Sequence, residues 1–418
     1  MISSKSQFSW KTVAGVVAVA AATIAQPAFA GYDEDGSMAM NSSSRNSAMS
    51  NSSMDDRAMA SSPMNGMSSS LMMSTNPMPM MSTLALGGRY KNQVRRVDSQ
   101  MKSVLMSLME LKPKPIEKLS PANARVQPNI ADAVRLTLTK QRRSTAPEAM
   151  ARVLDTTIPG PAGAVPVRVY WPRNAPSSNL PVVVYFHGGG FVLFDRDTYD
   201  SSARALSNAA KCMVVSVGYR RAPESRLPAA HEDSYAATQW VMNNAEKWGG
   251  NSDRVAVAGE SVGGNLAIDM CLMAKMRGGK MPIHQVLVYP VSDFTPPALN
   301  APSMLENRYA KPLNRAMIMW FGKYALPNPA FAKTALASPL KFADVRGLPA
   351  ATVVLAEIDP LRSQGEAYAR KLAANGIPTH VRLFKGVTHE FFGTGAVVNQ
   401  AKQAVAFAAA DLKTAFNR

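Results

Sequence analysis

The sequence is poor in cysteine, histidine and aromatic residues. Among its 418 residues there are two cysteines and five histidines, and 7% of the residues are aromatic. Two cysteines are too few for a disulfide framework, and the glycine-rich phosphate motifs GxxxxGK[ST] and GxGxxG are both missing. The sequence therefore gives no sign of a disulfide-rich scaffold or a nucleotide site, and we expect neither a metal ion nor an organic cofactor.

Acidic residues are also scarce. There are 29 aspartates and glutamates against 46 lysines and arginines, which gives a formal net charge of +17. Residues 1–88 hold five acidic and four basic residues, so the chain from residue 89 onward carries +18. Such a surface is either a solvated basic face or a source of weak attraction to anionic envelope lipid or polysaccharide. No nucleic-acid motif accompanies the charge, so we expect no nucleic-acid partner.

Residues 1–30 have the features of a secretory signal. They hold two lysines, then an apolar run over 13–25, and they end in an A-x-A motif before Gly31. The apolar run is too short for a comfortable transmembrane helix, and no cysteine follows the motif to accept a lipid. We therefore expect export to a bacterial periplasm or beyond, with Gly31 as the mature N-terminus.

Residues 31–88 are rich in serine, asparagine and methionine and contain hardly any aromatic or β-branched residues. Such a segment cannot bury enough apolar surface to order itself, so we predict a disordered tail ahead of a domain at 89–418. Twelve methionines lie between Met38 and Met81. Because thioethers bind Cu(I), a copper-sequestering tail is an alternative to a plain spacer, although the tail has no histidine or cysteine to support it.

The most informative segment surrounds Ser261. An apolar run over 255–258 leads into Gly259-Glu260-Ser261-Val262-Gly263, and a helical pattern follows. A strand, a sharp turn and a helix with a serine at the apex form a nucleophile elbow, which needs small flanking residues because the turn is tight. The glycines on either side of the serine meet that need. The motif is common by chance, so its meaning depends on the rest of the chain.

A serine nucleophile needs a base, a carboxylate to orient the base, and donors for the oxyanion. The apolar run 181–186 ends in His187 and three glycines, whose unshielded N–H groups are suited to an oxyanion hole that the N–H of Val262 would complete. Asp359 and His389 each follow a predicted strand, where an open α/β sheet places its chemistry. Nucleophile, acid and base then occur in the order found in α/β-hydrolases.

The other histidines and nearby carboxylates have structural interpretations. His187 is expected to brace the glycine loop, and Glu260 to point away from Ser261 and stabilise the elbow by hydrogen bonding. The remaining alternatives lie in or beside predicted strands and helices, or in an earlier loop: His231, His284, His380, Asp344 and Glu357.

Taken together, these motifs resemble the hormone-sensitive-lipase-like bacterial esterases of the α/β-hydrolase superfamily. The resemblance covers roughly residues 95–418 and is carried by His187–Gly190, Tyr219–Glu224, Gly259–Gly264, and Asp359–Leu361 with His389. It implies that Ser261 is the nucleophile, His389 the base and then the acid, and Asp359 the orienting carboxylate. It also implies that the oxyanion hole consists of the N–H groups of Gly188, Gly189 and Val262.

The chain departs from the pattern of this family at three places. Val262 stands where alanine is common, which is expected to narrow the acyl pocket, and Glu260 replaces the commoner aspartate. Ser363 and Gln364 stand where acidic residues usually follow the Asp359 motif. We expect this last change to alter the setting of the Asp359 loop without removing the triad.

From about residue 150 strands and helices alternate, which predicts an α/β fold, a mostly parallel sheet covered by helices on both faces. Strands are expected near 152–158, 165–171, 181–186, 212–218, 255–259, 285–289, 351–357 and 379–384. Helices are expected near 197–210, 229–248, 263–277, 363–375 and 396–416. Segments 90–145 and 296–330 fall outside the alternation, and the resemblance implies that they form a small helical cap over the site. Cys212 and Cys271 are expected to be inert core thiols, a disulfide being the alternative that export permits.

The sequence thus predicts a serine carboxylesterase that hydrolyses short- to medium-chain acyl esters, on small-molecule substrates, through an acyl-enzyme. The same triad could cleave amides, lactones or carbamates, and the motifs do not separate these bonds from esters. A binding or copper-sequestering protein of the envelope is the alternative from another class. The natural substrate and the oligomeric state stay open.

Overall fold

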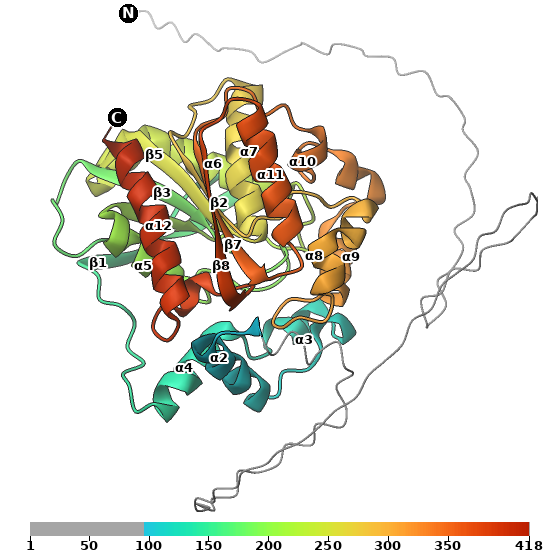
Figure 1. The fold of residues 1–418 in the computed structure, drawn as a ribbon. Helices are drawn as coiled ribbons and strands as arrows, with labels where there is room; N and C mark the ends of the chain where they lie inside the picture. Colours follow the sequence, from blue (N-terminus) through green and yellow to red (C-terminus); the bar gives the residue numbers. More distant parts are fainter. Residues whose placement is uncertain (1–95, 418) are drawn as a thin grey trace, which may run out of the picture. The chain divides into compact units, whose positions relative to one another are not determined.

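The computed structural model describes residues 96–417. The predicted signal at 1–30 and the predicted tail at 31–88 lie outside the described residues. The part that is described contains a central sheet with helices on both sides and a group of short helices at one end of it (Figure 1). None of the helices within 96–417 is both long and apolar enough to cross a membrane.

Eight strands form one sheet in the order β1-β2-β4-β3-β5-β6-β7-β8. They are β1 (Arg152–Gly160), β2 (Gly163–Trp171), β3 (Leu180–Phe186), β4 (Met213–Val217), β5 (Gly250–Glu260), β6 (Gln285–Val288), β7 (Ala351–Ile358) and β8 (Thr379–Thr388). The pairs β1–β2 and β2–β4 are antiparallel, and every other pair is parallel. All eight predicted strands are confirmed, and so is the mostly parallel sheet.

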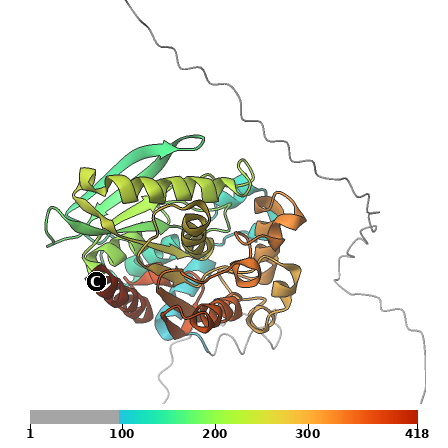
Figure 2. The ribbon, with the colours of Figure 1, turned by 90° about the horizontal axis from the view of Figure 1, so that it is seen from above.

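Five helices cover the sheet: α5 (Asp200–Ala210), α6 (Ala229–Asn244), α7 (Val262–Arg277), α11 (Arg362–Ala374) and α12 (Asn399–Phe416). Side chains from α6, α7 and α11 pack into one hydrophobic core, and side chains from α5 and α12 pack into a second core on the other face. Figure 2 shows helices on both sides of the sheet. The five predicted helices are therefore confirmed.

The central strands are apolar on both faces because each face meets a core. In β3 the side chains of Val182, Val184 and Phe186 belong to one core, and those of Val183 and Tyr185 belong to the other. This alternation follows from the two-residue period of a strand, and it explains why the run reads as continuously hydrophobic. A parallel sheet covered in this way collects its strand ends, and the loops that follow them, at one edge.

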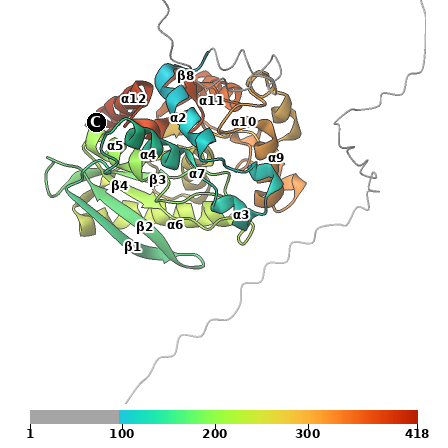
Figure 3. The same ribbon diagram turned by 90° about the horizontal axis from the view of Figure 1, so that it is seen from below.

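The two segments outside the alternation form short helices near that edge. Segment 90–145 holds α2 (Ser99–Glu110), α3 (Pro121–Arg125) and α4 (Ile130–Lys140), and segment 296–330 holds α8 (Pro302–Glu306) and α9 (Arg315–Ala325). Figure 3 shows α3 beside α9. The Trp320 indole Nε1 donates to the Leu119 carbonyl at 3.0 Å, which joins the two segments directly. We call them together the cap.

The remaining helical pieces are short. They are α10 (Pro339–Phe342) and the 3₁₀ helices η2 (Ile116–Lys118), η3 (Ala245–Trp248), η4 (Pro296–Asn300), η5 (Pro329–Lys333) and η6 (Phe392–Thr394). η2 belongs to the first cap segment and η4 to the second.

Candidate active site

Ser261 sits at the turn between β5 and α7 with φ 60° and ψ −119°. A non-glycine residue rarely adopts this conformation, and such strain persists only where the surroundings hold it. Here the Ser261 N–H donates to the Val288 carbonyl at 2.9 Å, and the Ser261 carbonyl accepts from the Val291 N–H at 3.1 Å. The neighbouring strand β6 and the loop after it therefore hold the serine at the apex of the predicted elbow.

The glycines that flank the serine are required by close backbone contacts. A Cβ atom added to Gly259 would lie 2.0 Å from the Gly263 carbonyl oxygen, and one added to Gly263 would lie 2.1 Å from the Phe186 carbonyl oxygen. These separations leave no room for any side chain. The elbow can form only where both positions lack a Cβ, which is the physical reason for the motif.

Asp359 and His389 meet although thirty residues separate them in the chain. The His389 Nδ1–H donates to Asp359 Oδ2 at 2.8 Å, and both side chains are almost completely buried. The other carboxylate oxygen, Oδ1, accepts from the Leu361 N–H at 2.8 Å, which fixes the orientation of the carboxylate. The bond at Nδ1 leaves His389 Nε2 as the basic nitrogen of the ring.

Ser261 and His389 line the same cavity. No hydrogen bond joins the two side chains within residues 96–417, and in enzymes without substrate this contact is commonly long. The structure thus brings Ser261, His389 and Asp359 together at the carboxyl ends of β5, β8 and β7, where the sequence placed them.

Burial and three carboxyl groups set the basicity of His389. Burial opposes its charged form, but the charge and hydrogen bond of Asp359, with the further negative charges of Glu390 and Glu260, outweigh burial and raise the pKa of His389 above its ordinary value. Glu390 was not singled out from the sequence, although it directly follows the predicted base. It has φ 64°, it is partly buried, and the Tyr199 hydroxyl donates to its Oε1 at 3.2 Å. Burial raises the pKa of Glu390 to about 7.

Replacing Glu390 by glutamine is expected to move the acidic limb of the activity profile to lower pH. Only neutral His389 can act as a base, so kcat/KM rises with pH through the pKa of this histidine. Glu390, with a pKa of about 7, carries its negative charge over the upper part of this range. Removing that charge makes the imidazolium less stable there, so the pKa of His389 falls. The measurement is kcat/KM against pH for both proteins. An acidic limb that stays in place or moves to higher pH would contradict this account.

The glycine loop after β3 presents unpaired N–H groups. Gly188 and Gly189 of this loop are buried, and so is Val262 at the start of α7. Among the described residues, no acceptor pairs with the N–H groups of these three. Gly189 has φ 99°, in a region where L side chains are strained. Buried unpaired donors are costly unless a ligand satisfies them, which is what an oxyanion hole requires.

His187 braces this loop, as predicted. Its ring stacks on Tyr219 with 4.2 Å between the centroids, and its Nδ1–H donates to the Gly188 carbonyl at 2.8 Å. The Tyr219 hydroxyl donates to the His187 carbonyl at 2.8 Å. Burial lowers the pKa of His187 to about 4, so the ring is neutral near pH 7 and serves as a structural group.

Glu260 also has the structural position that was predicted. Its carboxylate is buried and accepts hydrogen bonds from the hydroxyls of Tyr185 and Tyr289, on the opposite face of the sheet from α7. Burial raises the pKa of this carboxyl group. Glu260 therefore connects the base of the elbow to β3 and to the end of β6.

The alternative histidines and carboxylates have partners elsewhere. His231 pairs with Asp269 at 3.0 Å in the interior, and His380 pairs with Asp411 at 3.0 Å near the surface. His284 contacts the Thr352 hydroxyl, Asp344 pairs with Lys275, and Glu357 pairs with Arg96. None of these acidic or histidine side chains lines the cavities beside Ser261, in keeping with their predicted structural roles.

The two cysteines are free and buried, as predicted. Burial raises the pKa of both thiols, of Cys212 and Cys271, well above the usual range. Neither thiol forms a reactive thiolate near neutral pH. Within the described range no group of three or more acidic, cysteine or histidine side chains is arranged to hold a metal ion.

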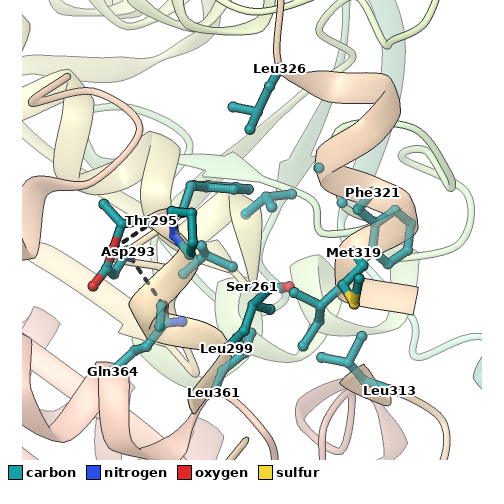
Figure 4. Close-up of a pocket in the computed structure, with 18 residues that line it drawn as sticks. Ser261, Asp293, Thr295, Leu299, Leu313, Met319, Phe321, Leu326, Leu361 and Gln364 are labelled. Atoms are coloured by element: carbon teal, nitrogen blue, oxygen red, sulfur yellow. Dashed lines mark hydrogen bonds between the residues drawn. The ribbon is translucent and has the colours of Figure 1, made fainter. Parts of the chain in front are cut away.

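Two cavities meet at Ser261. The larger, of about 270 Å³, is lined by the elbow, the loop after β6, α9 and the start of α11, and most of its wall is apolar (Figure 4). We call it the apolar cavity. The smaller, of about 110 Å³, is lined by both cap segments together with Ser261, His389 and Glu390. We call it the cap cavity.

The cap side chains divide between these cavities. Met319 and Phe321 line the apolar cavity, and Met317 and Phe321 line the cap cavity. Trp320 instead packs between the two cap segments through its bond to Leu119. The sequence indicated that the cap would shape the pocket. It did not indicate that Asp293, Thr295 and Gln364 would form part of the wall, although Gln364 had been noted as a departure from the family pattern.

Comparisons with known proteins agree with this geometry. A family model described as the alpha/beta hydrolase fold matches residues 183–393. The chain is 39% identical over 259 residues to esterase LipI of Mycobacterium tuberculosis, covering 60% of this chain and 79% of that protein. It is 34% identical over 241 residues to ethyl acetate hydrolase of Pseudomonas putida, covering 57% of this chain and 75% of that protein.

Solved structures show the same similarity. The hyperthermophilic esterase from the archaeon Pyrobaculum calidifontis superposes with a TM-score of 0.68 at 36% identity, covering 76% of this chain and 98% of that one. The thermostable carboxylesterase EstE1 from a metagenomic library superposes with a TM-score of 0.65 at 39% identity, covering 71% and 98%.

Proposed function

The chain belongs to the hormone-sensitive-lipase-like esterases of the α/β-hydrolase superfamily and is a carboxylic ester hydrolase, and on that premise we propose how its site works. Ser261 attacks the ester carbonyl while His389 takes its proton, and Asp359 orients His389 and stabilises the imidazolium. The N–H groups of Gly188, Gly189 and Val262 stabilise the oxyanion. His389 then protonates the departing alcohol and activates the water that cleaves the acyl-enzyme.

The two cavities divide the substrate between them. His389 must reach the alcohol oxygen in order to protonate it, so the alcohol belongs in the cap cavity, which His389 lines. The acyl chain then belongs in the apolar cavity, which contains Ser261 and Val262 but not His389. The single observation that carries this proposal is that Ser261 lies where the two cavities join.

The size of the apolar cavity supports short to medium acyl chains. A cavity of about 270 Å³, with Val262 and Phe321 in its wall, has room for an acyl chain of short to medium length. Hydrolysis of p-nitrophenyl esters from acetate to palmitate tests this, with Ser261→Ala protein as the control for background. We expect kcat/KM to be highest for the short and medium chains. A maximum at palmitate would contradict the assignment, and absence of turnover across the series would direct attention to amides, lactones or carbamates.

Export and weak attraction to anionic envelope surfaces also stay proposals. They are supported by the signal-like residues 1–30 and by the charge of +18 from residue 89 onward. The intact mass of the protein recovered from the periplasm or the medium tests the first, since cleavage before Gly31 predicts one definite mass. Retention of the protein on anionic vesicles, compared at low and high salt, tests the second.

A further inference from the structure

Gln364 stands in the first turn of α11 with its side-chain amide held in one orientation. Its Oε1 accepts from the N–H groups of Ser292 and Asp293, both at 3.1 Å. Two backbone donors can be satisfied only by the oxygen of the amide, so the NH₂ group has to occupy the other position. The orientation of the amide therefore follows from the loop after β6.

The NH₂ group of Gln364 is a donor at the wall of the apolar cavity. Gln364 is 4% exposed and lines this cavity together with Ser261. In Figure 4 its nitrogen points toward the side on which Ser261 lies. No residue within 96–417 accepts a hydrogen bond from Nε2, whereas Oε1 has two donors. A substrate that fills the cavity would take this donor out of water. Leaving it without an acceptor is then costly, so the cavity favours a substrate that carries an acceptor at this place.

Asp293 and Thr295 lie beside Gln364 and add hydrogen-bond acceptors to the same wall. The Thr295 N–H and hydroxyl both donate to Asp293 Oδ1, at 2.8 and 2.6 Å. The hydroxyl proton of Thr295 is thus already in use, and what this residue presents to the cavity is lone pairs. Asp293 and Thr295 are 5% and 8% exposed and line the same cavity as Gln364. We call Asp293, Thr295 and Gln364 the polar wall.

Next to the polar wall, the lining of the apolar cavity is hydrocarbon. Leu299, Leu326 and Phe321 supply hydrocarbon surface, and Figure 4 shows the three residues of the polar wall grouped together apart from Phe321 and Leu313. A plain alkyl chain would fill this space while leaving the amide donor unsatisfied. An acyl chain with an oxygen atom at the right carbon would fill it and satisfy the donor as well.

We propose that the polar wall recognises an oxygen atom on the acyl chain, so that the enzyme prefers esters of oxo- or hydroxy-acids to esters of simple alkanoic acids. The inference rests on the proposed function, because it takes the apolar cavity as the acyl site. The donor is the Gln364 NH₂ group, and the acceptor is the oxo or hydroxyl oxygen. A hydroxyl would in addition donate to the lone pairs of Thr295 or Asp293.

The test uses pairs of ethyl esters that differ only at the oxygen. Ethyl 4-oxopentanoate and ethyl 5-oxohexanoate are each compared with the ester that carries a methyl group in place of the oxo oxygen, and with the corresponding hydroxy ester. For the wild-type protein we expect kcat/KM to be about tenfold or more higher for the oxo and hydroxy esters than for the methyl analogue, at whichever of the two oxygen positions fits better. The reason is that an unpaired donor in the site discriminates against an analogue that lacks the acceptor.

Gln364→Glu removes the donor with little change in size, and it adds a negative charge beside Asp293. Its carboxylate keeps an oxygen for Ser292 and Asp293 and replaces the NH₂ group by a second acceptor of almost the same size. At a pH where the new carboxyl is ionised, we expect the preference for the oxo ester to disappear and the preference for the hydroxy ester to remain, since a hydroxyl can donate to the new oxygen. A change in cavity shape alone would affect both esters alike. Gln141→Glu, an exposed position at the end of α4, is the matched control.

Two results would overturn the inference. One is a wild-type protein that turns over each oxo ester no faster than its methyl counterpart. The other is a Gln364→Glu protein with an unchanged ratio and an unchanged melting temperature. The ratio of kcat/KM between oxo ester and methyl analogue in the wild-type protein tests the inference even if the variant does not fold. Failure of the proposed function would look different, since the wild-type protein would then leave every ester intact or Ser261→Ala protein would retain turnover.

Discussion

Ser261→Ala protein is expected to hydrolyse esters with a kcat about 10⁴- to 10⁶-fold below that of the wild type, by analogy with other dissected triads. Removing the hydroxyl removes the atom that forms the acyl-enzyme. His389, Asp359 and the unpaired N–H groups of the glycine loop remain, so what activity is left would come from binding and oxyanion stabilisation alone. Burst and steady-state kinetics on p-nitrophenyl butyrate measure the loss.

The fold should survive this substitution. The bonds that hold the elbow are made by the backbone of Ser261, to Val288 and Val291, and alanine keeps both of them. Thermal unfolding of the variant therefore serves as the control, and we expect a melting temperature close to that of the wild type. A loss of activity below about a hundredfold in a well-folded variant would mean that another residue is the nucleophile.

Asp359→Asn should lower kcat by about 10⁴-fold, the size of effect measured for the equivalent substitution in another serine hydrolase. The Leu361 N–H donates to Oδ1 at 2.8 Å, so the amide oxygen of an asparagine would occupy that position and its NH₂ group would face His389. Nδ1 of the histidine would then have to accept a hydrogen bond, and the proton would reside on Nε2. The ring could no longer take a proton from Ser261.

Glu357→Gln is the matched control for this prediction. Glu357 is a carboxylate near the end of the same strand, but it pairs with Arg96 and accepts from the Gly386 N–H, away from His389. We expect the control to keep most of its activity, with at most a modest loss of stability. A large loss in Glu357→Gln together with a small one in Asp359→Asn would reverse the assignment of the acid.

Much of the fold could be predicted from the sequence because its signals are local. The runs of valine in β3 and β4, the alternation of strands with helices, and the glycines around Ser261 each act over a few residues, and the structure contains all eight predicted strands. The meeting of Ser261, Asp359 and His389 could be predicted as well, since strand ends of a parallel sheet gather at one edge and the order of the three residues is characteristic. The roles of His187 and Glu260 followed from their positions beside recognisable motifs.

The wall of the apolar cavity could not be predicted in the same way. Thr295 lies in the loop after β6, and Gln364 lies in the first turn of α11, almost seventy residues later. They share a cavity only because β6 and β7 are neighbours in the sheet. The same holds for Glu390 and Tyr199, whose hydrogen bond joins two distant segments. The sequence showed that Gln364 was unusual, but nothing in it showed which way the amide would point.

The sequence by itself determined the class of chemistry, since an elbow serine, a glycine loop, and an acid and a base in this order are properties of short segments. Only the tertiary structure decided what the site is shaped to accept. The packing of the cap produced two separate cavities at Ser261, and two backbone N–H groups from the loop after β6 turned the Gln364 amide nitrogen toward one of them. Local preferences act through neighbouring residues, whereas the shape and polarity of a cavity depend on side chains that meet only after the whole sheet has formed.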